Sequence, residues 1–181
     1  MLKLVEPTKE NLQKMKMGLK EIKAQPTSYD IGSVKKLIEF MDNDFEGYME
    51  YWQKRQVADN LPANRVPSTT LFLFDDDKFV GVYDVRHYLN DFLKTQGGHI
   101  AGEIVPSERG KGYGRQGLKL VLKWCHDHLK IDQVMVSCNA KNLASHRQLT
   151  AVLNEMGGRR DPDIQLDNHI ERRLWINTSQ R

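Results

Sequence analysis

The sequence IVPSERGKGYG, at residues 104–114, is the segment from which the fold can be predicted. An apolar, strand-like run enters it, and three glycines follow within five positions: Gly110, Gly112 and Gly114. A loop with so few Cβ atoms lets a ligand come close to its backbone. The amphipathic helix predicted to follow points unpaired N–H groups and the positive end of its dipole at the same place. We therefore expect a phosphate-like anion there, held also by three cationic side chains: Arg109, Lys111 and Arg115.

The composition is that of a globular chain, expected to be one domain over residues 1–181. A net charge of +3 and the lack of a long Lys/Arg block argue against nucleic-acid binding. The N-terminus has no signal-peptide pattern and no apolar run is long enough for a bilayer, so we expect a cytoplasmic protein without membrane contact. Cys125 and Cys138 lack metal-type spacing, and Asp75–Asp77 lack the spacing of a calcium loop, so no metal is expected.

The periodicity of apolar residues predicts a mixed order of elements. Strands are expected at residues 2–5, 69–74, 79–86, 99–105 and 131–138, and two more within 158–176. Helices are expected at residues 7–22, from about Asp30 through Met41 to Trp52, 112–129 and 142–156, with a short helical turn within 87–96. This order predicts an α/β fold with a central mixed, largely antiparallel sheet flanked by helices. The most regular helix has one apolar face: Leu118, Val121, Leu122, Cys125 and Leu129.

Three kinds of phosphate site compete for the glycine loop. Residues 112–117 match the dinucleotide pattern G-x-G-x-x-G, but the next strand ends at Val136-Ser137-Cys138 without the acidic residue that binds a ribose. A Walker A loop is excluded, because no Gly-Lys-Ser/Thr follows the glycines at the required spacing. Coenzyme A is the third ligand, and its pyrophosphate would suit the same backbone N–H groups.

The segment resembles the signature of the GNAT superfamily of acetyl-CoA-dependent N-acyltransferases, Gln/Arg-x-x-Gly-x-Gly/Ala. Arg109, Gly112 and Gly114 occupy its first, fourth and sixth positions, and the order of elements over residues 69–176 also fits. Two further segments are similar to an uncharacterised bacterial branch of predicted acetyltransferases: residues 86–90 and residues 97–100. The resemblance implies a GNAT fold and an enzyme that moves an acetyl group from acetyl-CoA to a primary amine of a small molecule or peptide.

The resemblance also implies where coenzyme A binds. Backbone N–H groups of residues 110–114, Tyr113 included, should hold the pyrophosphate. Ile104 and Val105 should pair with the pantetheine arm through their backbones, and the next strand should splay away to admit the thioester. Asn142, which opens the second helix, matches an Asn that touches this arm, although it also suits a plain helix cap. Ser145 is expected one turn further along the same side.

Two residues before the loop are candidate general bases for the amine. Glu103 lies in an apolar strand, where an unpaired carboxylate would be costly, and His99 begins that strand with an ordinary pKa near neutrality. Each also has a structural interpretation, a pair with an arginine such as Arg86 for Glu103 and a backbone hydrogen bond for His99. The acceptor pocket is expected to include Arg86, His87 and Asn90.

The chain departs from the family pattern at the general acid. Many members carry a Tyr seven residues after the helix-opening Asn, but Leu149 stands there and no Tyr follows Tyr113. Ser145, His146 or water would then protonate the thiolate, or no acid is needed. A covalent intermediate on Cys138 is the alternative route. A non-catalytic acyl-CoA-binding module and a nucleotide- or RNA-binding domain remain as other functions, and a homodimer is the default expectation for the family.

Overall fold

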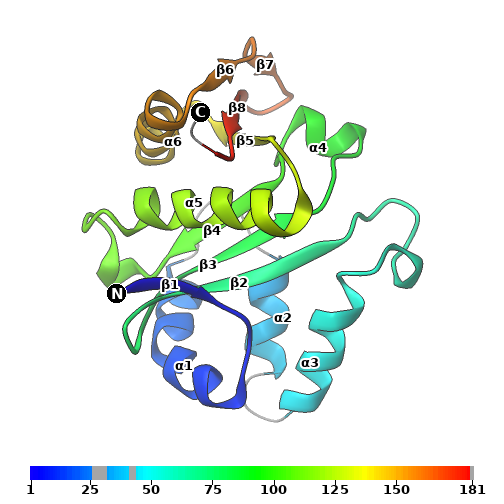
Figure 1. The fold of residues 1–181 in the computed structure, drawn as a ribbon, viewed down its shortest axis with the longest axis vertical. Coiled ribbons are helices and arrows are strands. Elements are labelled where there is room, and N and C mark those ends of the chain that lie inside the picture. Colours follow the sequence, from blue (N-terminus) through cyan, green and yellow to red (C-terminus); the bar gives the residue numbers. More distant parts are fainter. Residues whose placement is uncertain (26–31, 41–43, 180–181) are drawn as a thin grey trace.

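The computed structural model describes residues 1–25, 32–40 and 44–179, and its strands form two sheets (Figure 1). The first sheet has the order β1-β2-β3-β4, made of Leu2–Val5, Ser68–Asp75, Lys78–Arg86 and Ile100–Ile104. The second has the order β5-β8-β6, made of Gln133–Asn139, Ile170–Asn177 and Gly158–Arg160, and β7 (Ile164–Gln165) also pairs with β8. All of these pairings are antiparallel. The predicted α/β class is confirmed, with its strands divided into two sheets between β4 and β5.

Three helices cover one face of the first sheet (Figure 1): α1 (Lys9–Ala24), α2 (Gly32–Phe40) and α3 (Phe45–Lys54). The Thr8 hydroxyl caps α1 by accepting a hydrogen bond from the Asn11 N–H. The face predicted to be apolar is buried, as it should be: Leu12, Met15, Leu19 and Ile22. The predicted start of the second helical region near Asp30 and its continuation at Met41 lie outside the described residues.

Helix α5 (Tyr113–Trp124) covers the other face of the first sheet, and α6 (Leu143–Met156) packs against α5 and the second sheet (Figure 1). Of the predicted apolar face, Leu118, Val121, Leu122 and Cys125 are buried and Leu129 is half-buried. The prediction of one α-helix to residue 129 is wrong in its last part, because residues 125–129 form a π-helix that ends at Lys130 in a left-handed conformation. Apolar spacing alone does not distinguish i→i−5 from i→i−4 hydrogen bonds over one turn. No helix in the described ranges is long and apolar enough to cross a membrane.

The first sheet is buried on both faces, so side chains alternate between two cores. Along β2, Leu71 and Leu73 pack under α5, whereas Phe72 and Phe74 pack against α1–α3. Along β4, Ile100 and Ile104 belong to the α5 core, and Ala101 and Val105 to the α1–α3 core. The carboxylate of Glu103 therefore points to the face that carries α1–α3.

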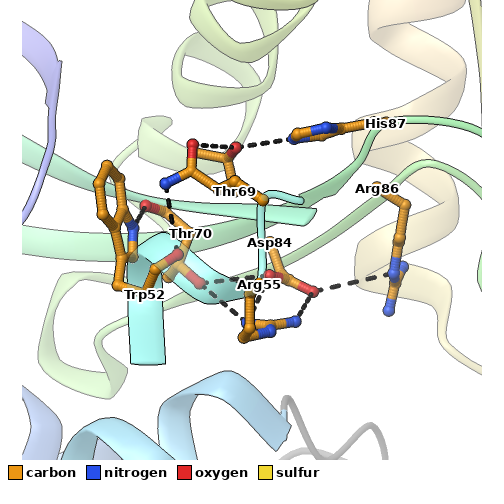
Figure 2. A network of polar contacts seen from close by, with 8 residues as sticks. Trp52, Arg55, Thr69, Thr70, Asp84, Arg86 and His87 are labelled. Carbon is orange, nitrogen blue, oxygen red and sulfur yellow. Dashed lines mark hydrogen bonds and ion pairs between the residues drawn. The ribbon is translucent and has the colours of Figure 1, made fainter. Parts of the chain in front are cut away.

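A buried polar network joins α3 to the first sheet (Figure 2). Asp84 of β3 is 4% exposed, and the Arg55 guanidinium contacts both of its carboxylate oxygens at 3.2 and 3.3 Å. The Thr70 hydroxyl donates to Asp84 at 3.2 Å, and Arg86 Nε lies 3.8 Å from it. The Trp52 indole donates to the Thr70 carbonyl at 2.9 Å. Two guanidinium groups thus share one buried carboxylate.

Candidate functional site

The glycine loop adopts a conformation that exposes a row of backbone N–H groups. Gly110 and Gly112 are left-handed, with φ of 79° and 84°, and Gly112 is the N-cap of α5. Within the described part of the chain, the N–H groups of residues 110–115 have no acceptor. Alternating left-handed glycines at a helix N-terminus form an anion-binding concavity. The loop predicted from the sequence therefore has the geometry of a phosphate site.

Tyr83 of β3 fixes the start of α5. Its hydroxyl donates to the Gly114 carbonyl at 3.2 Å, and its ring lies between Gly102 of β4 and Gly117 of α5. A Cβ on Gly102 would lie 2.4 Å from the Tyr83 ring, and a Cβ on Gly117 would lie 2.5 Å from its hydroxyl. These two glycines let α5 approach the sheet closely. No local sequence signal identifies Tyr83, because the contact joins three elements that are distant in the sequence.

Strand β4 is an edge strand of the first sheet and leads directly into the loop. Val105 donates its N–H to the Val80 carbonyl at 3.0 Å and accepts from the Glu108 N–H at 2.8 Å. Because alternate residues of an antiparallel strand bond to the same side, Ile104 directs its backbone groups to the free edge. Both backbone groups of Val105 thus have partners within the protein, whereas the backbone groups of Ile104 point to the free edge, where a pantetheine arm is expected.

The three predicted cationic side chains form ion pairs within the protein. Lys111 contacts the buried Glu108 at 3.0 Å, and Arg115 pairs with Glu155 of α6. Each cationic side chain remains 41–53% exposed, so exchange of partners is sterically open. The Tyr113 hydroxyl donates to Asp75 at 2.8 Å and so lies against the β2–β3 hairpin. Among the described residues, these three cations therefore have protein partners, whereas the backbone N–H groups of residues 110–115 do not.

Glu103 is buried and paired with Arg109. The Glu103 side chain is 4% exposed, and Arg109 Nη2 lies 3.0 Å from its Oε1. Arg109 Nε also donates to the Ile104 carbonyl at 3.2 Å, on the free edge of β4. The expectation that an arginine such as Arg86 would pair with Glu103 is wrong as to the residue, because Arg86 faces Asp84. A buried carboxyl group paired with a guanidinium is thus held beside the edge that precedes the loop.

His99 occupies the junction between the two sheets. The ring Nδ1 of His99 accepts a hydrogen bond from the Met135 N–H at 2.9 Å. The backbone N–H of His99 donates to the Met135 carbonyl at 2.7 Å. A ring nitrogen that accepts this bond takes up a proton only if the bond breaks. Burial, with Arg86 nearby, lowers the pKa of the His99 imidazole to about 4. The structure thus favours the backbone-bonded interpretation of His99 over a role as general base.

This pKa shift predicts loss of stability on acidification. In the unfolded chain His99 takes up a proton below its usual pKa of 6.5, whereas in the folded protein it does so only near pH 4. Between these pH values the unfolded state binds more protons, so acidification favours unfolding. The contribution is complete above pH 6.5 and declines toward pH 4, by about 3 kcal/mol at 1.36 kcal/mol per unit. Urea unfolding at pH 7 and pH 4.5 measures it. His99→Asn, which keeps an acceptor but does not titrate, should show a smaller pH dependence; an identical dependence would contradict the assignment.

The end of β5 and the first turn of α6 meet near the glycine loop. Asn142 is the N-cap of α6, and its Oδ1 accepts from the Ser145 N–H at 3.1 Å. A Cβ on Gly114 would lie 2.1 Å from the Gln148 side chain, so α6 lies against the start of α5. Ser145 hydrogen-bonds the Cys138 thiol, whose pKa is raised by burial. His146 instead approaches Thr150, with 3.4 Å between Nε2 and Oγ1.

The residues predicted for the acceptor pocket have structural partners. Arg86 donates to the carbonyls of Gly97 and Gly98, and burial lowers the pKa of its guanidinium. His87 Nε2 lies 2.8 Å from the Thr69 hydroxyl (Figure 2). Asn90 caps the short helix α4 (Asp91–Thr95) and donates to the Asn64 carbonyl. Asp84 was missed, although a charge in an apolar strand is the signal that identified Glu103.

Two surface hollows lie beside this region rather than in it. One, of about 570 Å³, lies between α1 and the β2–β3 hairpin and reaches Val105 and Glu108. The other, of about 680 Å³, lies between α5, the N-terminus and the segment after β8. Neither hollow is lined by His99 or by the loop glycines Gly110, Gly112 and Gly114. In the described ranges, no group of three or more His, Cys, Asp or Glu side chains could hold a metal ion.

The family model and the solved structures that are similar to this chain all describe acetyltransferases. A family model described as an acetyltransferase (GNAT) domain matches residues 24–152. No curated protein sequence matches the chain. RimL, a ribosomal alpha-N-protein acetyltransferase solved with coenzyme A, is similar in fold with a TM-score of 0.66 at 14% identity, covering 99% of this chain and 96% of that one.

Two other solved structures agree with this fold. The aminoglycoside acetyltransferase AAC(6')-Ib with coenzyme A has a TM-score of 0.61 at 12% identity, with coverages of 98% and 95%. A spermidine N-acetyltransferase SpeG chimera from Vibrio cholerae and hSSAT has a TM-score of 0.59 at 14% identity, with the same coverages. Since the family match spans more than half of the chain, including β2 to β5 and the glycine loop, the chain belongs to the GNAT acetyltransferases and is an acyltransferase.

Proposed function

We propose that this enzyme moves the acetyl group of acetyl-CoA directly to a primary amine of a small molecule or peptide. The observation that carries the proposal is the row of N–H groups at residues 110–115 that have no acceptor among the described residues, and this row continues from the free edge of β4. The N–H groups at the helix N-terminus can bind a diphosphate. The free edge of β4 can pair with the amides of a pantetheine arm, as it would with an added strand. Two of the similar structures named above contain coenzyme A, and the three proteins are described as acetyltransferases of amine-bearing substrates.

The pantetheine arm pairs with the outward backbone groups of Ile104. In the unliganded protein, Arg109 Nε donates to the Ile104 carbonyl. A pantetheine amide replaces Arg109 as the donor to this carbonyl, and the exposed Arg109 side chain turns toward the phosphates. Lys111 and Arg115 can turn in the same way, and each charge-assisted contact adds about 1.5–3 kcal/mol where solvent is partly excluded. The Asn142 side-chain amide keeps its N–H donors for the arm, because only its oxygen caps α6.

Glu103 is the general base of the proposed reaction. Its carboxylate lies next to Ile104 and on the face of α1–α3, so it takes a proton from the amine, directly or through water, as the nitrogen attacks the thioester carbon. The C–S bond then breaks, and coenzyme A leaves as a thiolate. The Ser145 hydroxyl lies against the end of β5 and donates a hydrogen bond to that thiolate, which takes its proton from water, whereas His146 turns away toward Thr150.

A covalent intermediate on Cys138 is disfavoured. The thiol is 1% exposed, and burial raises its pKa, so little of it ionises at neutral pH. A thiolate is the nucleophilic form of cysteine, and its formation here would place a charge in an apolar core. Direct attack by the amine needs no such group and requires only that its proton be removed.

Thermal unfolding with acetyl-CoA, NAD and ATP tests the ligand, together with two variants of one glycine. Gly110 is left-handed and a Cβ there meets nothing within 4 Å, so Asn and Asp both fit and both tolerate this conformation. Acetyl-CoA at 100 times Kd should stabilise the wild type by about 2.7 kcal/mol, more than NAD or ATP at the same concentration. Gly110→Asp should weaken acetyl-CoA binding at least about tenfold relative to Gly110→Asn, because only Asp adds a like charge.

The outcomes separate ligand from loop. If acetyl-CoA leaves the wild type unchanged, the proposed function is wrong. If acetyl-CoA binds equally to both variants, a diphosphate does not lie at the loop. Thiol release with a panel of a polyamine, an aminoglycoside and a peptide with a free N-terminus then identifies the acceptor. Hydrolysis of acetyl-CoA without any acetylated amine would contradict transfer to an amine.

A further inference from the structure

The two sheets are joined at residues 97–99, immediately before β4. His99 exchanges two hydrogen bonds with Met135 of β5, one from its own N–H and one to its ring Nδ1. The Gly97 N–H donates to the Ser137 hydroxyl at 2.8 Å. In the part of the chain that the structure describes, the His99–Met135 contact is the backbone–backbone hydrogen bond that connects this strand entry to β5.

The His99 ring accepts a backbone hydrogen bond that a carbonyl group of a neighbouring strand would otherwise accept. In a parallel pair, the N–H and the C=O of one residue bond to two different residues of the neighbouring strand. Here both groups of Met135 are bonded by the single residue His99, so Met135 needs no further partner from β4. The hydrogen-bond ladder therefore ends at this point, and the two strands are free to diverge beyond it.

Residues of both sheets contact this junction. The Trp175 ring of β8 meets the His99 ring edge-on, with 6.3 Å between ring centroids, and Trp175 donates to Asp161 at 2.9 Å. On the first sheet, Arg86 holds the carbonyls of Gly97 and Gly98 at 3.2 and 3.3 Å. A Cβ on Gly98 would lie 2.4 Å from the Met135 carbonyl oxygen, so the close approach of this turn to β5 requires glycine.

We propose that His99 is the positioning residue that sets where β4 and β5 diverge, and thereby places the free edge of β4 for the pantetheine arm. The inference rests on the proposed function, since the edge it places is the edge assigned to acetyl-CoA. His99 acts through the backbone of Met135 and touches no reacting atom. His99, predicted from the sequence as a base, thus contributes to the site by holding β4 and β5 in position.

Two substitutions of His99 and one remote substitution test this role. His99→Ala removes the acceptor and leaves the Met135 N–H without a partner, whereas His99→Asn places an amide oxygen where Nδ1 lies. Leu12→Ala in α1 empties a buried position, 3% exposed, on the far face of the first sheet and serves as a control for general loss of stability. The measurements are the Kd of acetyl-CoA by calorimetry, KM and kcat, and hydrogen exchange at the Met135 amide.

His99→Ala should raise the Kd and KM for acetyl-CoA at least about tenfold, with a smaller change in kcat at saturation, and should speed exchange at Met135. His99→Asn and Leu12→Ala should keep the Kd within about threefold of the wild type. An unchanged Kd in His99→Ala would overturn the inference while leaving the proposed function intact. A Kd for Leu12→Ala as weak as that of His99→Ala would also overturn it, whereas a wild type that does not bind acetyl-CoA would reject the proposed function itself.

Discussion

Glu103→Gln should lower kcat by about 10²–10⁴-fold, which is the usual contribution of a positioned general base. A lysine-like amine has a pKa near 10.4, so about three pKa units, or roughly 4 kcal/mol, separate it from its reactive form at pH 7. Glutamine has the size of glutamate and still accepts the hydrogen bond from Arg109, but it takes no proton from the amine. The Kd of acetyl-CoA should stay within about threefold. Thiol release at saturating substrates measures kcat.

Glu108 supplies the matched control for this variant. It is as buried as Glu103, and it also carries ion pairs, to Lys78 at 2.5 Å and Lys111 at 3.0 Å. Lys78 beside it lowers the pKa of its carboxyl, so Glu108→Gln likewise removes a buried negative charge. We expect Glu108→Gln to keep kcat within about threefold. Wild-type turnover in Glu103→Gln, or an equal loss in both variants, would rule out Glu103 as the base.

Asp84→Asn should lower the free energy of unfolding by about 3–5 kcal/mol, because it removes the carboxylate that Arg55 and Arg86 share (Figure 2). Asparagine has the same shape, so the loss reports charge rather than packing. For a chain of this length each kcal/mol lowers Tm by about 2–4 °C, so the midpoint should fall by roughly 10 °C. Urea unfolding followed by circular dichroism measures the change.

Thr70→Val is the control for this network. It removes one hydroxyl that donates to Asp84 at 3.2 Å and keeps both ion pairs, so it should cost about 1 kcal/mol. A double variant, Asp84→Asn with Arg55→Met, should recover part of the loss, because it no longer buries an unpaired guanidinium. If Asp84→Asn is no more destabilising than Thr70→Val, the two arginines are balanced by other groups.

The elements and the glycine loop could be predicted because their signals are local. The apolar spacing of residues 118–125 places α5, and three glycines before a helix predict the N–H concavity without knowledge of any other part of the chain. The end of α5 could not be predicted, because a π-turn uses the same apolar positions. The division of the strands into two sheets could not be predicted in the same way, because the two sheets meet through contacts between distant residues, such as His99 and Met135, which are 36 positions apart.

The partners of the site residues could not be predicted, because they depend on strand direction and register. Whether Val105 or Ile104 faces the free edge is decided by which of them bonds Val80. Glu103 pairs with Arg109 rather than Arg86 because the loop turns back over β4. Arg55 and Asp84 are 29 residues apart, and nothing in the intervening sequence indicates that they meet.

Tyr83 and Asp84, consecutive in β3, point to opposite faces of the first sheet: the phenol supports the start of α5, and the carboxylate anchors α3. A shift of β3 by one residue would reverse both, burying a charge beneath α5 and aiming the phenol at the guanidinium of Arg55. Single-residue insertions or deletions in the β2–β3 hairpin that shift β3 by one residue should therefore destabilise the packing of both α5 and α3 on the sheet. Insertions or deletions of two residues preserve the orientation of each side chain.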